Sequence, residues 1–363
     1  MKIILLGDIA FYGKYSISDN LDIYKYFSKI SQFLKKYDYV IGNLETPFSE
    51  NTKPYGAKSA HIKSDPNNVK LLNFLNINIV NLANNHMYDY GKKGYLLTKK
   101  ILNKEGIQYF GIENQQLLIN KNNNKIALHG YCGYLSNPLG IYNERYGINA
   151  LSIPKVEANL KKNSKLGYLN IISVHNGQEH VNYPSYEDIQ MARQFSKICP
   201  YVYYGHHPHV MQGMEKYNNS LIAYSLGNFC FDDVYTDKSN NPLIKQSENN
   251  KTAFMLELEI ENSKVINYKT IPIYLGELSL EIDSIDTLNA LDAYSKKLNE
   301  DKIIYIQKRT NLINKYIESR KSMRNLKWYA KRLKLKYVIM IFRSKYNIYK
   351  HKKNITNFLI KDI

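Results

Sequence analysis

Cysteine and long apolar runs are what this 363-residue sequence has least of. The three cysteines, Cys132, Cys199 and Cys230, are odd in number and far apart, so we expect no disulfide framework and no CxxC redox motif. This scarcity favours a reducing compartment. No apolar stretch approaches the roughly 20 residues of a membrane-spanning helix. The apolar opening stops at Gly7-Asp8, so we also expect no signal peptide.

Acidic residues are scarce in one part of the chain only. Residues 302–363, called the basic stretch below, hold 18 Lys and Arg against two acidic residues, a net charge of +16. The whole chain carries +18, which leaves +2 for residues 1–301. Because the two parts differ so strongly, we predict a globular domain over 1–276 and a basic helical appendage over 277–363.

Histidine, in contrast, is concentrated in a single turn. Gly205-His206-His207-Pro208-His209 follows Tyr201-Val202-Tyr203-Tyr204, whose aromatic and β-branched residues predict a strand. Gly205 allows a turn at the end of this strand, and Pro208 prevents the segment from continuing as a helix. A second predicted strand, 221–224, ends in Ser225-Leu226-Gly227-Asn228-Phe229. Two such strand ends predict one rim of a site, although a solvated histidine-rich loop would share the composition.

Predicted strands and helices alternate along the rest of the globular part. Apolar residues spaced three or four apart predict a helix over 20–37, and Asp65-Pro66 opens another that runs to about Asn76. A hairpin is expected over 253–273, and a polar loop over 237–251. The remaining elements that we predict are strands at 2–8, 39–42, 77–82, 106–111, 125–130 and 168–174, and helices at 91–105, 186–198, 286–298 and 303–317.

One arrangement recurs in this pattern. An apolar strand ends, and a side chain able to bind metal follows it. In an α/β sheet the loops at strand ends gather on one edge. Carboxylate, amide and imidazole groups suit Mn, Zn or Fe, and two such ions could clamp a phosphoryl group. The candidates are Asp8, Asn43, Glu45, Asn85, His86, His175, His207 and His209.

Each candidate also has a structural explanation. Asp8 could cap the turn after the first strand, and Asn84-Asn85 could be turn residues with positive φ. His175 could be a core histidine whose hydrogen bonds are satisfied, and Glu45 a solvated loop acid. Their order along the chain favours a shared polar site over these separate explanations.

Six ordered motifs carry a resemblance to a known family. They are Gly7-Asp8, Asn43-Leu44-Glu45-Thr46-Pro47, Ala83-Asn84-Asn85-His86 with Asp89-Tyr90-Gly91, His175-Asn176-Gly177-Gln178-Glu179, the histidine turn at 205–209, and 224–229. Over about residues 2–275 the chain resembles the CapA family of poly-γ-glutamate capsule biosynthesis proteins. The resemblance implies an α/β fold, a four-layer α/β/β/α sandwich of the metallo-dependent phosphatase type. It also implies a role in capsule or exopolymer production.

The resemblance assigns roles residue by residue. Asp8 resembles the first metal carboxylate, Asn43 or Glu45 would replace the bridging acid, and Asn85 resembles the asparagine ligand. His86 resembles the catalytic histidine, while Asp89 and Glu179 would orient imidazoles around it. His175, His207 and His209 resemble the later ligands. Two positions depart from the pattern, since Asp8-Ile9-Ala10 lacks the histidine of an Asp-x-His opening and Asn176 replaces a usual tryptophan.

These observations lead to one functional hypothesis and one alternative. We expect a hydrolase of phosphoester or related bonds, dependent on one or two divalent ions, that helps to make, modify or export an anionic cell-surface polymer. The alternative is a non-catalytic polymer-binding or assembly factor with the same fold, so whether the chain is an enzyme stays open. We expect it in the cytoplasm or at the inner face of the cell membrane, with capsule-synthesis proteins among its partners.

The basic stretch has three interpretations of its own. Trp328 and the apolar run Val338–Phe342 among lysines and arginines resemble an interfacial segment that binds an anionic membrane surface. A docking surface for an acidic partner or polymer fits the same charge. Nucleic acid is the least favoured partner, because no recognised nucleic-acid motif accompanies the charge.

Overall fold

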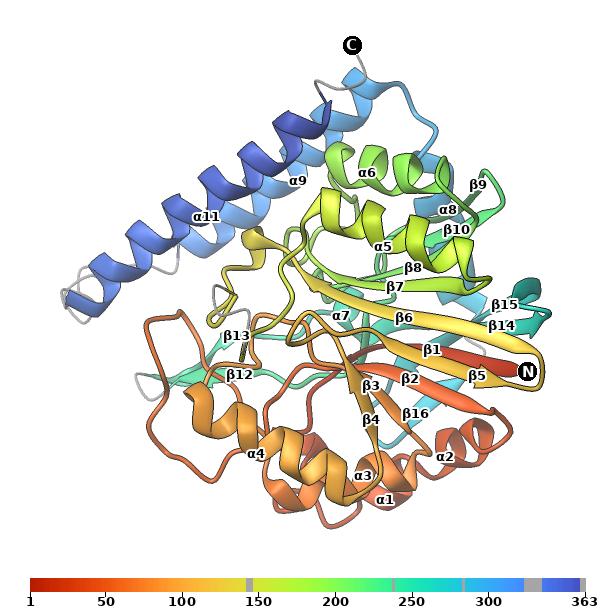
Figure 1. Ribbon diagram of the computed structural model, residues 1–363. Coiled ribbons are helices and arrows are strands. Elements are labelled where there is room, and N and C mark those ends of the chain that lie inside the picture. The colour runs from red at the N-terminus through yellow and green to blue at the C-terminus, as the bar shows by residue number, and fades with distance from the viewer. Residues whose placement is uncertain (142–145, 237–238, 283–284, 323–334, 360–363) are drawn as a thin grey trace.

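Two β-sheets lie face to face between two layers of helices (Figure 1). The computed structural model describes residues 1–141, 146–236, 239–282, 285–322 and 335–359. The expected α/β class and four-layer sandwich are confirmed by this arrangement. The strands that were predicted to precede candidate site residues are all present.

The first sheet has the order β16-β15-β14-β1-β2-β3-β4, and β11 pairs with β1 beside this path. Its core strands β1 to β4 are parallel, whereas β14 runs antiparallel to β1 and pairs with β15 in the expected hairpin. The bounds are β1 Lys2–Ile9, β2 Tyr39–Leu44, β3 Ile79–Asn81, β4 Gln108–Phe110, β11 Asn228–Cys230, β14 Thr252–Glu261, β15 Lys264–Leu275 and β16 Leu280–Ile282.

The second sheet has the order β5-β6-β7-β8-β10-β9. Its four central strands are parallel, so their carboxyl ends meet at one edge, and the two outer strands are antiparallel. The bounds are β5 Leu117–Lys121, β6 Asn124–Cys132, β7 Leu169–His175, β8 Tyr201–His206, β9 Met214–Tyr217 and β10 Ser220–Ala223.

Alternation along the buried strands explains the layers. In β1, Ile3 and Leu5 face the second sheet, while Ile4 and Leu6 belong to the cluster beneath the first helical layer. That layer contains α1 Ile23–Tyr26, α2 Ser28–Leu34, α3 Val69–Phe74 and α4 Gly91–Lys104. The layer over the second sheet contains α5 Ile153–Lys165 and α6 Tyr186–Ser196, which pack on a third cluster.

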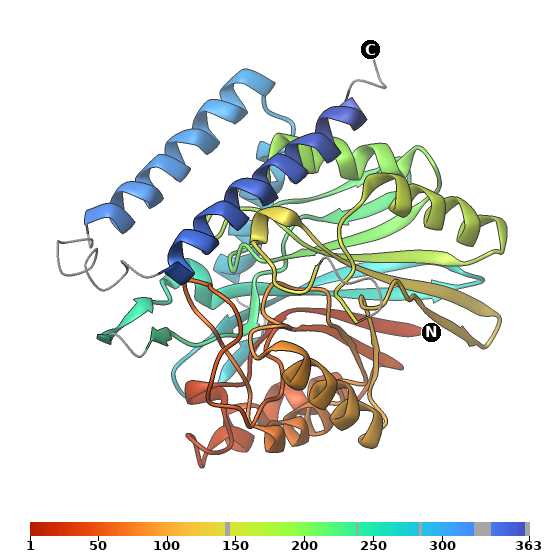
Figure 2. The same cartoon turned by 60° about the vertical axis from the view of Figure 1, so that its left-hand side comes forward.

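The C-terminal segment forms three described helices, α8 Ile285–Lys297, α9 Lys302–Ser322 and α11 Leu335–Leu359. Leu291 of α8 is buried in the cluster between the sheets. Helices α9 and α11 lie outside the sandwich along the same side of it in both views (Figures 1 and 2). Whether 1–276 and 277–363 behave as separate domains stays a prediction. Within the described residues, no helix is long and apolar enough to cross a membrane.

Three local predictions were wrong or fall outside the description. The helix expected over 20–37 is broken at Phe27 into α1 and α2. The polar loop expected over 237–251 contains a strand, β13 Ser239–Ile244, paired with β12 Val234–Thr236, and a short helix, α7 Glu248–Lys251. Of the predicted interfacial segment, Trp328 lies outside the described residues, whereas the apolar run Val338–Phe342 lies in α11.

Candidate metal centre

The carboxyl ends of both sheets deliver the candidate side chains to one place. Asp8 near the end of β1 is in register with Asn43 on β2 and with Asn228 on β11. In the second sheet, His175 at the end of β7 is in register with His206 on β8. Because both sheets present these ends at the same edge of the sandwich, residues far apart in the sequence become neighbours.

Hydrogen bonds connect the two sheets through amide side chains. The Asn43 amide Nδ2 donates to Asp8 Oδ1 over 2.7 Å and lies 3.3 Å from His175 Nδ1. Asn85 Oδ1 lies 3.0 Å from His175 Nε2. His209 Nδ1 lies 3.0 Å from Asn228 Oδ1 and 3.3 Å from Asp8 Oδ2. Asp8 and His209 are 201 positions apart in the sequence.

Glu45 is the centre of the cluster. Its carboxylate is completely buried, and neither oxygen accepts a hydrogen bond from a described residue. Three imidazole Nε2 atoms surround Oε1, those of His175 at 3.6 Å, His209 at 3.7 Å and His86 at 3.9 Å. These separations are too long for hydrogen bonds. They approach the separation of roughly 3–3.5 Å between two ligand atoms of the same ion, each of which lies about 2.0–2.2 Å from that ion.

Two groups of ligand atoms share Glu45. One consists of Glu45, His175 and His207, and the other of Asp8, Glu45 and His209, with the atoms of each group within 4.8 Å of one another. A shared carboxylate between two such groups fits one or two divalent ions. The donors are imidazole nitrogens and carboxylate oxygens, which suit Mn, Zn or Fe. The residues present therefore fit the expected metal.

The local field favours a cation at this point. Burial and the nearby Asp8 carboxylate raise the pKa of Glu45 well above its usual value. Burial alone would lower the pKa of His209, but the Glu45 and Asp8 carboxylates outweigh it and raise that pKa to about 10. The two buried carboxylates of Glu45 and Asp8 thus share the positive charge of the His209 ring. A bound divalent cation would offset the same negative charge of the carboxylates.

His86 belongs to a second buried network beside Glu45. Its Nδ1 lies 2.6 Å from Asp89 Oδ2, and Asp89 Oδ1 accepts a 2.7 Å hydrogen bond from Lys58 Nζ. Burial raises the pKa of Asp89, but the charges of Lys58 and His86 hold it at about 2. Asp89 is therefore ionised and accepts the Nδ1 proton of His86, so that Nε2 faces Glu45.

Glu179 lines the same pocket, but its contacts differ from the expected ones. Among the described residues, it makes no hydrogen bond or ion pair with an imidazole. Burial raises its pKa, yet the nearby rings of His207, His180 and His209 lower it to about 2. The pocket has a volume of about 240 Å³, and its wall also includes Lys58, Asn137 and Phe231.

The structure brings together every candidate named from the sequence. Their assignment as ligands or catalytic groups stays a prediction. Sequence reasoning missed Lys58, which lies in a loop with no strand or helix to mark it. The candidate list also left out His206, whose Nδ1 lies 3.2 Å from Asp8 Oδ1. Asn228 could have been found from its place at the end of the sixth motif.

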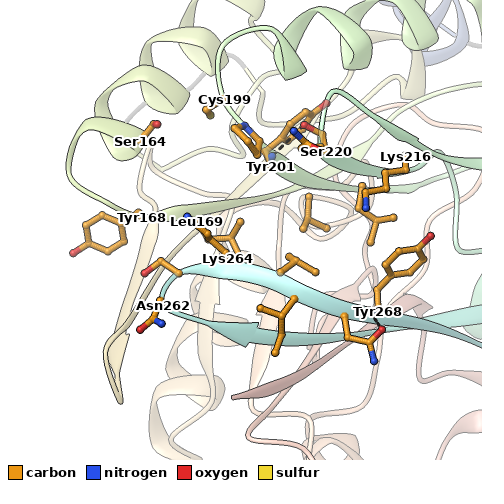
Figure 3. A pocket seen from close by; sticks show the side chains of 18 of the residues that line it. Ser164, Tyr168, Leu169, Cys199, Tyr201, Lys216, Ser220, Asn262, Lys264 and Tyr268 are labelled. Carbon is orange, nitrogen blue, oxygen red and sulfur yellow. Dashed lines mark hydrogen bonds between the residues drawn. The ribbon is translucent and has the colours of Figure 1, made fainter.

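A larger cavity, of about 810 Å³, lies at the other end of the strands. Residues of β8 and β10, such as Val202 and Ser220, line one side of it, and residues of the β14–β15 hairpin, such as Lys264 and Tyr268, line the other (Figure 3). None of the clustered histidines and carboxylates lines this cavity. Size alone therefore does not identify the candidate site.

Comparison with known proteins covers the part of the chain that holds these residues. The family model described as bacterial capsule synthesis protein PGA_cap matches residues 2–233, which include every candidate site residue. The chain belongs to this family. The resemblance to CapA proteins expected from the six motifs is thereby confirmed.

Two relatives are named CapA. The capsule biosynthesis protein CapA of Bacillus anthracis is 32% identical over 233 residues, which cover 60% of this chain and 56% of that protein. The PGA biosynthesis protein CapA of Bacillus subtilis is 29% identical over 255 residues, 66% of each chain. The chain thus spans less than two thirds of the length of these curated relatives.

Solved structures show weaker similarity. A hypothetical protein from Thermus thermophilus has a TM-score of 0.45 at 13% identity, covering 75% of this chain and 98% of that one. The 5'-nucleotidase precursor from the same organism has a TM-score of 0.44 at 9% identity, covering 82% and 58%. Scores this low establish no shared function.

Proposed function

We propose that the chain is a metal-dependent hydrolase of a phosphoester or related bond in an anionic capsule polymer or its precursor. The observation that carries this proposal is the buried Glu45 carboxylate, which lacks a hydrogen-bond donor among the described residues and is shared by two groups of ligand atoms. Membership of a capsule-synthesis family supports the polymer as the setting. We further propose that the protein acts at the inner face of the cell membrane, with the basic stretch toward the anionic membrane surface. Its partners would be capsule-synthesis proteins.

The chain's own residues provide positioning and proton transfer. A bound Mn, Zn or Fe ion would supply Lewis acidity and charge compensation for a phosphoryl group. Asp8, Glu45, Asn85, His175, His207 and His209 would hold it, with Asn43 orienting Asp8 and His175. Asp89 and Lys58 fix the ring of His86, and when this ring carries a second proton its Nε2 would give that proton to the leaving group. Glu179 places a negative charge near the ring of His207.

The experiment that tests this proposal compares metal content and activity in wild type and Glu45→Gln. Wild-type protein should contain a stoichiometric transition metal by mass spectrometry and cleave a generic phosphodiester with Mn²⁺. Glu45→Gln should lose most of both, because an amide of the same shape lacks the charge that the ion requires. Glu113→Gln, which removes a carboxylate from an ion pair outside the cluster, is the matched control.

Ala10 favours one alternative. It is fully buried where an Asp-x-His opening would supply an imidazole, so the centre has one ligand fewer. A protein that binds metal but cleaves no phosphodiester with any divalent ion would be a polymer-binding or assembly factor that uses the site for recognition.

A further inference from the structure

Helix α11 presents an unusual outer face. Five large apolar residues within eight positions are exposed, Leu335 at 76%, Val338 at 47%, Ile339 at 54%, Ile341 at 53% and Phe342 at 69%. Four of them, at 335, 338, 339 and 342, have the spacing of one helical stripe. Contiguous exposed apolar surface of this kind marks an interaction site. We call these five residues the apolar face.

The opposite face of α11 is fixed to the body. Ile355 is buried in the apolar cluster beneath α5 and α6. Asn354 Nδ2 donates a hydrogen bond to the Leu151 carbonyl over 3.0 Å. Tyr337 and Asn347 are also buried. Because the inner side is held in this way, the apolar face cannot turn inward without breaking these contacts.

Positive charge surrounds the apolar face. The sequence of α11 contains no acidic residue, and its Lys345, Lys352 and Lys353 are exposed. In the sequence, residues 323–334 directly before α11 comprise five basic residues, no acidic one and the only tryptophan of the chain. An apolar stripe bordered by lysines complements a bilayer that contains anionic lipid, where acyl chains take up the former and headgroups the latter.

The same helices touch the mouth of the site pocket. Asn137, which lines the pocket, accepts hydrogen bonds from Asn347 Nδ2 at 2.9 Å and Arg343 Nε at 3.2 Å, both on α11. On α9, the ring of Tyr316 lies 5.2 Å from that of His180, which also lines the pocket. A membrane surface that binds α11 would therefore also lie close to the mouth of the pocket.

We propose that the apolar face of α11 docks on an anionic bilayer and places the mouth of the site pocket at the lipid surface. The substrate would then be a chain held at, or emerging from, the membrane. The docking surface stands on its own evidence, and only the nature of the substrate rests on the proposed function. Figure 2 shows α9 and α11 together on the side from which this docking would occur.

The first experiment measures flotation of the full-length protein with phosphatidylcholine vesicles, with and without phosphatidylglycerol. Wild type should bind anionic vesicles, and Ile339→Ser with Phe342→Ser should weaken this binding about tenfold or more. The matched control, Leu21→Ser with Leu278→Ser, removes two exposed apolar residues elsewhere and should bind like wild type. Emission of Trp328 should shift to shorter wavelength when wild type binds. Glu45→Gln should bind equally well, which separates docking from the function of the site.

A second experiment tests the orientation. The three native cysteines are buried, so a fluorophore can be attached to a single introduced cysteine. With a headgroup-linked quencher in the vesicles, a label at Ser59→Cys, beside the pocket mouth, should be quenched. A label at Asn262→Cys, in the turn of the β14–β15 hairpin, should not be quenched.

Several outcomes would overturn the proposal. They are no vesicle binding by wild type, equal binding to neutral vesicles, equal quenching of the two labels, or a double variant of the apolar face that changes the oligomeric state and leaves vesicle binding intact. The last result would assign the apolar face to a second copy of the chain.

Discussion

Single side chains decide which roles are open to the histidines of the site. His175 has both ring nitrogens engaged by amides, Asn43 at Nδ1 and Asn85 at Nε2, and its Nε2 also faces Glu45. His86 has Nδ1 committed to Asp89, and its Nε2 is the histidine atom farthest from Glu45 Oε1 among the three. This difference predicts a ligand role for His175 and a proton-transfer role for His86.

The two roles separate in variants. His175→Ala should lose bound metal, because it removes a ligand atom from the group that includes Glu45 and His207. His86→Ala should keep most of the metal and lower turnover about 10²–10⁴-fold, the usual contribution of a general acid or base. Metal content by mass spectrometry and the rate of phosphodiester cleavage measure both effects, with His61→Ala as the control. Equal loss of metal in both variants would instead make His86 a ligand.

A histidine outside the site should govern stability in acid. His129 is buried beside Asn163 and Asn170, and burial lowers its pKa to about 4, against 6.5 when solvated. The folded state therefore prefers the neutral ring. Its contribution is complete above pH 6.5 and is lost as the pH falls from there toward 4, since the unfolded chain binds the proton first. The loss is about 3 kcal/mol at most.

Urea unfolding of wild type and His129→Gln between about pH 7 and pH 4 measures this contribution. The free energy of unfolding should fall more steeply in wild type, because the variant lacks the titrating ring while other histidines remain in both. Parallel curves would contradict the assignment.

At the scale of elements, the ends of the strands could be predicted from the sequence, but the break in a predicted helix could not. An apolar run followed by Asp8, Asn43 or His175 marks a strand end in the sequence itself, and parallel topology then brings these ends together. The break of the 20–37 helix at Phe27 has no such local sign, because Phe27 fits the apolar period of a helix. Its ring packs between Phe11 and Phe229, a tertiary contact that the sequence does not reveal.

The histidine turn shows the same division between local and long-range causes. A turn at Gly205 follows from the residue type, but the need for glycine there is tertiary, since a Cβ would lie 1.8 Å from the Tyr224 carbonyl oxygen. His207 and His209 both have positive φ, a conformation uncommon for residues other than glycine. Strain of this kind is typical of functional sites, where the surrounding structure holds it in place. Sequence spacing alone could name these histidines but not their geometry.

At the scale of the whole molecule, most of the net charge lies in the C-terminal part of the chain, whereas most of the buried apolar residues lie in the rest. The basic stretch carries +16 of the +18 charges, yet of its described residues only Tyr305 and Ile355 are buried members of the apolar clusters. Among the described residues, none beyond 301 belongs to the clusters between the sheets and beneath the first helical layer. Helix α8, in contrast, contributes Leu291 to the cluster between the sheets and so belongs energetically with the body.

Removal of residues 302–363 tests this division. Losing the burial of Tyr305 and Ile355 should cost about 3–6 kcal/mol, a large part of a typical total of about 5–15 kcal/mol. We therefore expect a chain that still folds, with a lower melting temperature and wild-type metal content, but no binding to anionic vesicles because its net charge falls to +2. Circular dichroism, thermal unfolding and metal analysis measure the outcome, with the full-length chain as reference. A truncated chain that cannot fold would instead make α9 and α11 part of the structural core, because two buried side chains could not account for so large a loss.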